Sequence, residues 1–168
     1  QPRSRGLGDV YKRQNINNFM SRAIELSIAS VRSNGGPFGC VIVKNNKIIA
    51  EGYNKVTETN DPTAHAEIVT IRKACNELKN FHLKGTEMYT SCEPCPMCLS
   101  AIYWSHIDKI YYGNTRKDAA KIGFDDNFIY DELSIDLNKR KITLQQVKQQ
   151  DAIKAFREWE LKTDKIKY

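Results

Sequence analysis

Residues 65–98 constrain this chain more than any other stretch, because they begin with His-Ala-Glu and end with three closely spaced cysteines. His65, Cys95 and Cys98 offer one imidazole and two thiolates, a set that Zn²⁺ binds tetrahedrally while its fourth position stays open for water. Glu67, two residues after His65, is near enough to carry a proton for that water without being a ligand. The stretch therefore predicts a catalytic zinc site.

Cys92 leaves a second choice of ligands open, because Cys92 and Cys95 are also separated by two residues. Pro94 directly precedes Cys95, and Pro96 is suited to the first turn of a helix. A helix that begins there places both sulfurs of Cys95 and Cys98 beside the positive end of its dipole, where thiolates are favoured. We therefore expect Cys92 to be a buried apolar residue. For an isolated Cys-x-x-Cys, a redox pair is the alternative.

The composition favours one compact domain. The 168 residues are 40% hydrophobic and 27% charged, which is enough for one sizeable core. The five cysteines are an odd number, and the chain has neither an apolar signal segment nor an apolar run long enough for a membrane span. We therefore expect a cytoplasmic protein with reduced thiols and no membrane partner.

Residues 1–14, QPRSRGLGDVYKRQ, show no helix or strand period and are interpreted as a non-native or disordered leader. Residues 15–168 are then the single domain. The leader holds four basic residues and one acidic residue, so the rest of the chain carries a formal charge of +3 out of the total of +6. This modest charge argues against a nucleic acid partner.

Hydrophobic periodicity predicts alternating strands and helices. Helices are expected at 16–31, from Asp61 and Pro62 onward, at 96–105, at 115–122 and from Asp151 onward, and strands at 37–43, 47–53, 86–92, 109–113 and 142–147. Residues 124–130 are expected to form a loop that runs into a short helix. The strand, helix, strand order at 86–113 predicts parallel pairing, with ligands at the carboxyl end of strand 86–92.

Three motifs make residues 15–168 resemble the cytidine deaminase superfamily: GGPFG at 35–39, NDPTAHAE at 60–67 and TSCEPCPMCLSAIYW at 90–104. An H-x-E motif followed by P-C-x-x-C is the known signature of its zinc deaminases. GFDDNFIY at 123–130 and the terminal KxY resemble the bacterial guanine deaminase branch. The resemblance implies a three-layer α/β fold with a five-stranded mixed sheet between helices. It also implies a homodimer that exchanges its C-terminal segments.

The same resemblance implies site roles. His65, Cys95 and Cys98 would bind Zn²⁺, and Glu67 would shuttle protons. The candidates for contact with a purine base are Asn54, Asp126, Tyr168, Ala66, Phe38 and Trp104.

Each of these contacts competes with an ordinary structural role. Asn54 offers a donor and an acceptor to a purine edge, but asparagine at a strand end is usually a turn residue. Asp126 can accept hydrogen bonds from the ring N–H groups of guanine or cap a helix. A C-terminal Tyr168 would ordinarily be frayed unless it reaches the site of a neighbouring subunit. Phe38 and Trp104 can stack on a base or simply pack.

The activity implied by the resemblance is zinc-dependent hydrolytic deamination of guanine to xanthine and ammonia, with attack at C2 and Glu67 as proton carrier. tRNA adenosine deaminases share the zinc motifs, but the acidic FDD segment and the modest charge argue against tRNA. A nucleoside deaminase acting on guanosine or cytidine is another alternative. An inactive zinc-stabilised binding module is the last one, and Glu67 argues against it, because a structural zinc site needs no carboxylate beside an open position.

Overall fold

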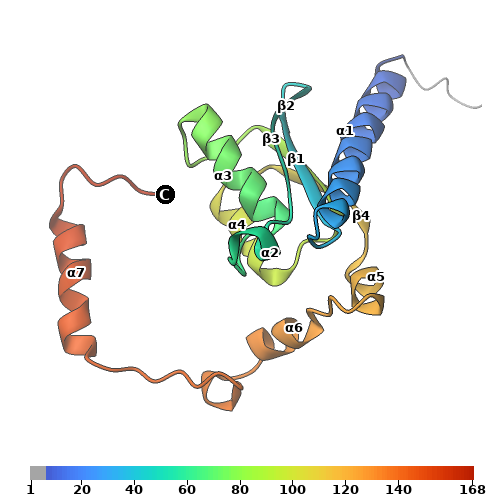
Figure 1. The fold of residues 1–168 in the computed structure, drawn as a ribbon. Coiled ribbons are helices and arrows are strands. Elements are labelled where there is room, and N and C mark those ends of the chain that lie inside the picture. Colours follow the sequence, from blue (N-terminus) through green and yellow to red (C-terminus); the bar gives the residue numbers. More distant parts are fainter. Residues whose placement is uncertain (1–6) are drawn as a thin grey trace, which may run out of the picture. The chain divides into compact units, whose positions relative to one another are not determined.

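The computed structural model describes residues 7–168. The chain divides into two compact units: unit 1 ends at Asp126, and unit 2 covers Asn127–Tyr168. Unit 1 holds the sheet and the helices that carry the predicted metal ligands (Figure 1). The predicted boundary between a leader and a single domain at residue 14 stays a prediction.

Four strands form the sheet of unit 1 in the spatial order β2-β1-β3-β4. Their bounds are Gly39–Lys44 for β1, Lys47–Tyr53 for β2, Thr86–Cys92 for β3 and Lys109–Asn114 for β4. β1 pairs antiparallel with both β2 and β3, whereas β3 pairs parallel with β4. The mixed sheet and the parallel pair across the β3–β4 crossover are thus confirmed.

The predicted fifth strand at 142–147 is wrong, so the sheet has four strands and not five. Ile142, Leu144 and Val147 are 79%, 53% and 69% exposed. Residues 143–148 pair with no other segment, and unit 2, all of which is described, contains no strand. The apolar residues at 142–147 resemble a strand, but a strand also needs a neighbour for its backbone N–H and C=O groups.

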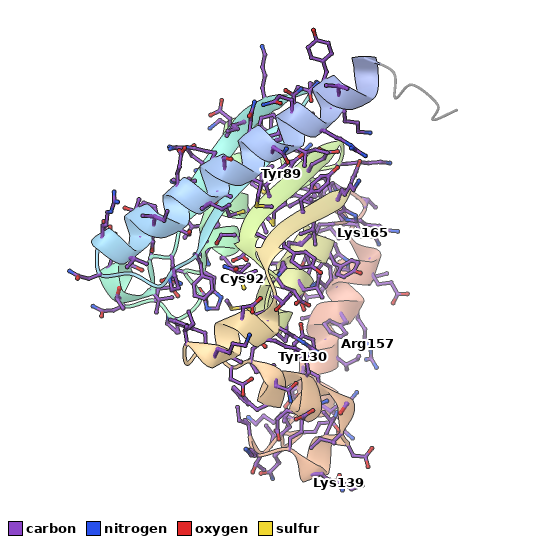
Figure 2. All side chains as sticks on the ribbon, turned by 90° about the vertical axis from the view of Figure 1, so that its right-hand side faces the viewer. Tyr89, Cys92, Tyr130, Lys139, Arg157 and Lys165 are labelled. Carbon is purple, nitrogen blue, oxygen red and sulfur yellow. The ribbon has the colours of Figure 1, made fainter. Side chains whose placement is uncertain are left out.

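Helices cover both faces of the sheet, which confirms the predicted three layers (Figure 1). On one face lies α1 (Leu7–Arg32), where its apolar side packs against Val41, Val43 and Tyr89 (Figure 2). On the other face lie α3 (Ala66–Leu78) and α4 (Pro96–Trp104). Their core residues there include Ile71, Ala74 and Ile102, packed with Cys40, Ile42 and Met88.

Two of the helices begin earlier than predicted. α1 begins at Leu7 and not at residue 16, so residues 7–14 of the predicted leader are helical, while residues 1–6 lie outside the described part. Val10 and Tyr11 are 56% and 69% exposed, so packing does not hold these residues in a helix. They extend a helix that has already formed, and each added residue gains one backbone hydrogen bond. α7 (Gln149–Leu161) places Asp151 in its first turn and not at its cap.

α3 begins later than predicted, at Ala66 and not at Asp61. The Asp61 carboxylate accepts hydrogen bonds from the backbone N–H and the hydroxyl of Thr63, at 2.8 and 2.7 Å. This local bonding holds a turn in place of a first helical turn. The delay makes His65 the residue that immediately precedes the helix.

The remaining helices are short. They are α2 (Val56–Thr59), α5 (Arg116–Lys121), α6 (Asn127–Ser134) and a 3₁₀ turn at Leu137–Lys139. The predicted loop that runs into a short helix after Phe124 is confirmed. Within residues 7–168, no helix combines the length and the apolar composition that a membrane span requires.

A bidentate ion pair links α1 to β2. Arg22 donates from Nε to Oε2 of Glu51 at 2.8 Å and from Nη2 to Oε1 at 2.6 Å. The Arg22 hydrogen bonds lower the pKa of Glu51. The pair therefore stabilises the fold above the unfolded pKa of about 4.3, and this contribution is lost as the pH falls through the folded pKa.

We expect Glu51→Gln to lower the free energy of unfolding at neutral pH by about 0.2–1 kcal/mol, a small value because exposed pairs are screened by solvent. The two side chains are 40% and 39% exposed. Urea denaturation at neutral pH and below about pH 4 should show a difference from the wild type that shrinks in acid. An equal difference at both pH values would contradict the assigned role of the pair.

Candidate metal centre

Two helix N-termini carry the predicted ligands. His65 and Cys95 directly precede α3 and α4, and Cys98 lies in the first turn of α4. Nδ1 of His65 lies 3.5 Å from Sγ of Cys95 and 3.5 Å from Sγ of Cys98. In a tetrahedral site with bonds of about 2.0 Å to nitrogen and about 2.3 Å to sulfur, these atoms are about 3.5 Å apart. The three side chains therefore fit Zn²⁺.

Cys92, labelled in Figure 2, is the last residue of β3, and it does not belong to the group of three ligands. It is 5% exposed, and its Sγ lies 3.7 Å from the carbonyl oxygen of Thr115. Burial raises the pKa of the Cys92 thiol to about 11. The prediction that Cys92 is buried is confirmed, and the structure groups His65 with Cys95 and Cys98 instead.

The pKa values of the two cysteine ligands are shifted in opposite directions. Hydrogen bonds from Cys98 and from His65 lower the pKa of Cys95 to about 4, although burial opposes the shift. The pKa of Cys98 is raised by its interaction with Cys95 and by burial. Cys95 therefore loses its proton more readily than Cys98, and both sulfurs must be deprotonated to bind a metal.

Glu67 lies beside the three ligands but outside their group. The side chain is 5% exposed. Its Oε1 accepts a hydrogen bond of 2.9 Å from the Thr90 hydroxyl, and its Oε2 accepts one of 3.4 Å from the Cys98 thiol. Burial raises the pKa of Glu67, and a proton carrier works best when its pKa is close to the working pH.

Asn54 directly follows β2 and is 7% exposed. Its Oδ1 accepts a hydrogen bond of 3.2 Å from the backbone N–H of Val56, so the side chain does serve a turn. Its Nδ2 donates to no side chain or carbonyl in residues 7–168. Contact of this amide nitrogen with a substrate stays a prediction.

Phe124 holds the segment that leads to Asp126. Its ring meets that of Phe38 edge to face, with centroids 5.0 Å apart, so packing occupies one side of Phe38. Burial and the negative charge of Cys95 raise the pKa of Asp126. Sequence reasoning missed the role of Phe124, because an aromatic residue in a polar loop does not reveal its partner.

The other predicted contacts differ in exposure. Ala66 is fully buried as the first residue of α3, between His65 and Glu67. Trp104 is 66% exposed at the end of α4 that is remote from Cys95. Tyr168 ends unit 2 and is 75% exposed. Their contacts with a substrate stay predictions.

A mixed sheet between helices, with this donor set at two helix N-termini, defines a catalytic zinc protein. The profile of the cytidine and deoxycytidylate deaminase zinc-binding region matches residues 13–114, and the chain belongs to this family. It is 47% identical to the guanine deaminase of Bacillus subtilis (strain 168) over 155 residues, which are 92% of this chain and 99% of that protein. The superfamily resemblance is thus confirmed, and the chain is a zinc-dependent aminohydrolase.

Two further similarities are informative. The X-ray structure of guanine deaminase from Bacillus subtilis matches this fold with a TM-score of 0.88, over 90% of this chain and 98% of that one. The tRNA-specific adenosine deaminase of Buchnera aphidicola subsp. Schizaphis graminum is 34% identical over 126 residues, which are 75% of this chain and 80% of that protein.

Proposed function

We propose that this protein converts guanine and water to xanthine and ammonia. The observation that carries the proposal is the 47% identity to a guanine deaminase over 99% of its length. The aligned 155 residues are more than unit 1 contains, so the similarity extends into unit 2. It therefore includes part of the C-terminal segment as well as the zinc motifs.

His65, Cys95 and Cys98 would hold Zn²⁺, which when bound supplies Lewis-acid activation of water at neutral pH. Glu67 would accept a proton from that water at Oε2, the oxygen that faces the ligand side. It would deliver this proton to a ring nitrogen, take the second proton of the water from the oxygen now bonded to C2, and pass it to the amino nitrogen at C2. The C2–N bond breaks, ammonia leaves, and the oxygen of water remains on C2 as the xanthine oxygen.

Asn54 and Asp126 would orient the base. The Oδ1 of Asn54 bonds to the backbone of Val56, so its Nδ2 would be the group that donates to a ring nitrogen or carbonyl oxygen of a purine. The Asp126 carboxylate can accept from ring N–H groups, which guanine has and which the base-pairing face of adenine lacks. This pair would favour guanine over adenine, because a base without ring N–H donors leaves the Asp126 carboxylate unpaired.

tRNA adenosine deamination is the second candidate, and the 34% identity to a tRNA-specific adenosine deaminase favours it. The two activities can be separated by incubating zinc-loaded protein with a panel of substrates: guanine, guanosine, adenine, cytosine, cytidine and tRNA. We expect ammonia and xanthine from guanine, with a kcat/KM at least roughly tenfold above that of any other substrate. Inosine formed in tRNA, without turnover of guanine, would replace the proposal.

We also propose a homodimer in which the end of unit 2 reaches the site of the partner subunit. The helices of unit 2 have no buried residue of their own. In α7, Phe156, Trp159 and Leu161 are 73%, 44% and 80% exposed. Such exposed apolar side chains are a common mark of a protein interface, and a closed dimer would cover them symmetrically.

Deletion of residues 163–168 tests the role of Tyr168. We expect the KM for guanine to rise roughly tenfold or more, since tenfold corresponds to one lost contact of ordinary strength, while the zinc content stays unchanged. A chain with Glu67→Gln and an intact tail, co-assembled with the tail-deleted chain, should recover activity, because one complete site forms across the interface. Normal turnover by tail-deleted homodimers would end this proposal, and so would an inactive mixture in which pull-down detects hybrids.

A further inference from the structure

Thr90 of β3 holds the Glu67 carboxylate from the sheet side. Its hydroxyl donates to Oε1 of Glu67 at 2.9 Å. Thr90 is fully buried, and Glu67 is 5% exposed. The backbone of Thr90 is fixed on both sides, because it pairs with Cys40 of β1 and with Tyr112 of β4. The donor therefore lies on an interior strand of the sheet, while the acceptor lies on α3.

Metal binding makes this contact more important. The other side-chain donor to Glu67 is the Cys98 thiol, 3.4 Å from Oε2. As a zinc ligand Cys98 is a thiolate and has no proton to donate. Thr90 is then the single side-chain donor left to Glu67 among the described residues.

We propose that Thr90 is the positioning residue of the proton carrier: its hydroxyl holds Oε1 of Glu67, so that Oε2 faces the metal centre. The inference rests on the proposed function, in which Glu67 moves protons at Oε2. The last side-chain torsion angle of a glutamate, χ3, has a broad distribution and no strongly preferred value. Without the hydroxyl, the carboxylate can turn away from the reacting atoms, and small misplacements of a catalytic group are costly in rate.

Three variants at position 90 test the proposal. Thr90→Val keeps the shape but removes the donor, Thr90→Ala removes donor and bulk, and Thr90→Ser keeps the donor. We expect Val and Ala to lower kcat for guanine roughly tenfold to a hundredfold, the scale of one lost hydrogen bond to a charged group. KM and zinc content should hardly change, since the Thr90 hydroxyl bonds to Glu67 and Thr90 is not one of the grouped metal ligands. Thr90→Ser should restore kcat to within about threefold of the wild type.

Thr86→Val is the matched control. Thr86 is also fully buried on β3, but its hydroxyl donates to the carbonyl oxygen of Leu83 at 2.6 Å and not to Glu67. The Thr86→Val variant should be destabilised about as much as Thr90→Val, but its kcat should equal that of the wild type. Equal losses of kcat in the two valine variants would assign Thr90 a structural role only and overturn the proposal.

Crystal structures of zinc-loaded wild type and zinc-loaded Thr90→Val supply a readout that does not depend on turnover, because Cys98 as a metal ligand no longer donates to Glu67. We expect Oε1 of Glu67 to leave its position beside residue 90, and an unmoved carboxylate would overturn the inference. If Thr90→Val does not fold, the comparison of Thr90→Ala with Thr90→Ser decides. Thr90→Ser must have the higher kcat, and equal losses of kcat in these two variants would overturn the proposal. A wild type that does not deaminate guanine would instead refute the proposed function, and the crystal structures would still test the positioning.

Discussion

Glu67→Gln is expected to retain its zinc and to lose guanine turnover by roughly 10²-fold or more, the scale of general acid and base catalysis. Glutamine keeps the size of the side chain and can still accept the hydrogen bond of Thr90 at its Oε1. It has no ionisable oxygen, so no proton can be taken from water at the ligand side. Steady-state assays with guanine, together with zinc analysis of the same preparations, measure both quantities.

A matched control for this substitution lies on the same helix. Glu77 is exposed on α3, outside the metal centre, so Glu77→Gln removes the same charge without touching the site. Its kcat should equal that of the wild type. If Glu67→Gln kept its activity, Glu67 could not be the proton carrier, and a loss of only a few fold would limit it to orienting water.

The metal ligands were predictable because their chemistry leaves a mark in the sequence. Cys95 and Cys98 stand two residues apart beside Pro94 and Pro96, a spacing that fixes both sulfurs once a helix starts at Pro96. His65 lies 30 residues away in the chain from Cys95, and its distance of 3.5 Å could only come from the packing of α3 and α4 on one face of the sheet. The motif identified the residues, but the fold brings them together.

Thr90 shows what the pattern could not reveal. A threonine in a strand is ordinary, because β-branched residues favour strands. Its functional contact is with Glu67, 23 residues earlier in the chain, and depends on how α3 lies over β3. Neither spacing nor composition marks such a contact. Phe124 is similar, since its partner Phe38 is 86 residues away and only the folded chain pairs the two rings.

Residues 142–147 illustrate the opposite failure. Ile142, Leu144 and Val147 have the apolar and β-branched character of a strand, and local preference alone predicted one. Pairing depends on a neighbouring strand, which unit 2 does not contain. The helix boundaries were also decided by specific bonds, as at Asp61, where two hydrogen bonds from Thr63 delay the start of α3 to Ala66.

Cys98→Ala is expected to lose its metal, whereas Cys92→Ala is expected to keep it. The wild type should hold about one zinc per chain, as three ligands and one open position imply. With Cys98 removed, His65 and Cys95 leave only two donors, and the buried side of the site is empty because Cys98 is the fully buried ligand. Zinc should then be lost on dialysis against a mild chelator.

Cys92→Ala is the matched control, because Cys92 is also a buried cysteine of the same motif and its Sγ faces the Thr115 carbonyl instead of the ligands. Atomic absorption on dialysed samples measures the ratio of zinc to protein, and thermal unfolding checks that both variants fold. The variants should differ in metal and not in fold, because each loses one small buried side chain at the β3–α4 connection. Zinc retained by Cys98→Ala and lost by Cys92→Ala would move the thiolate ligand from α4 to the end of β3, and Oε2 of Glu67 would then no longer face a ligand.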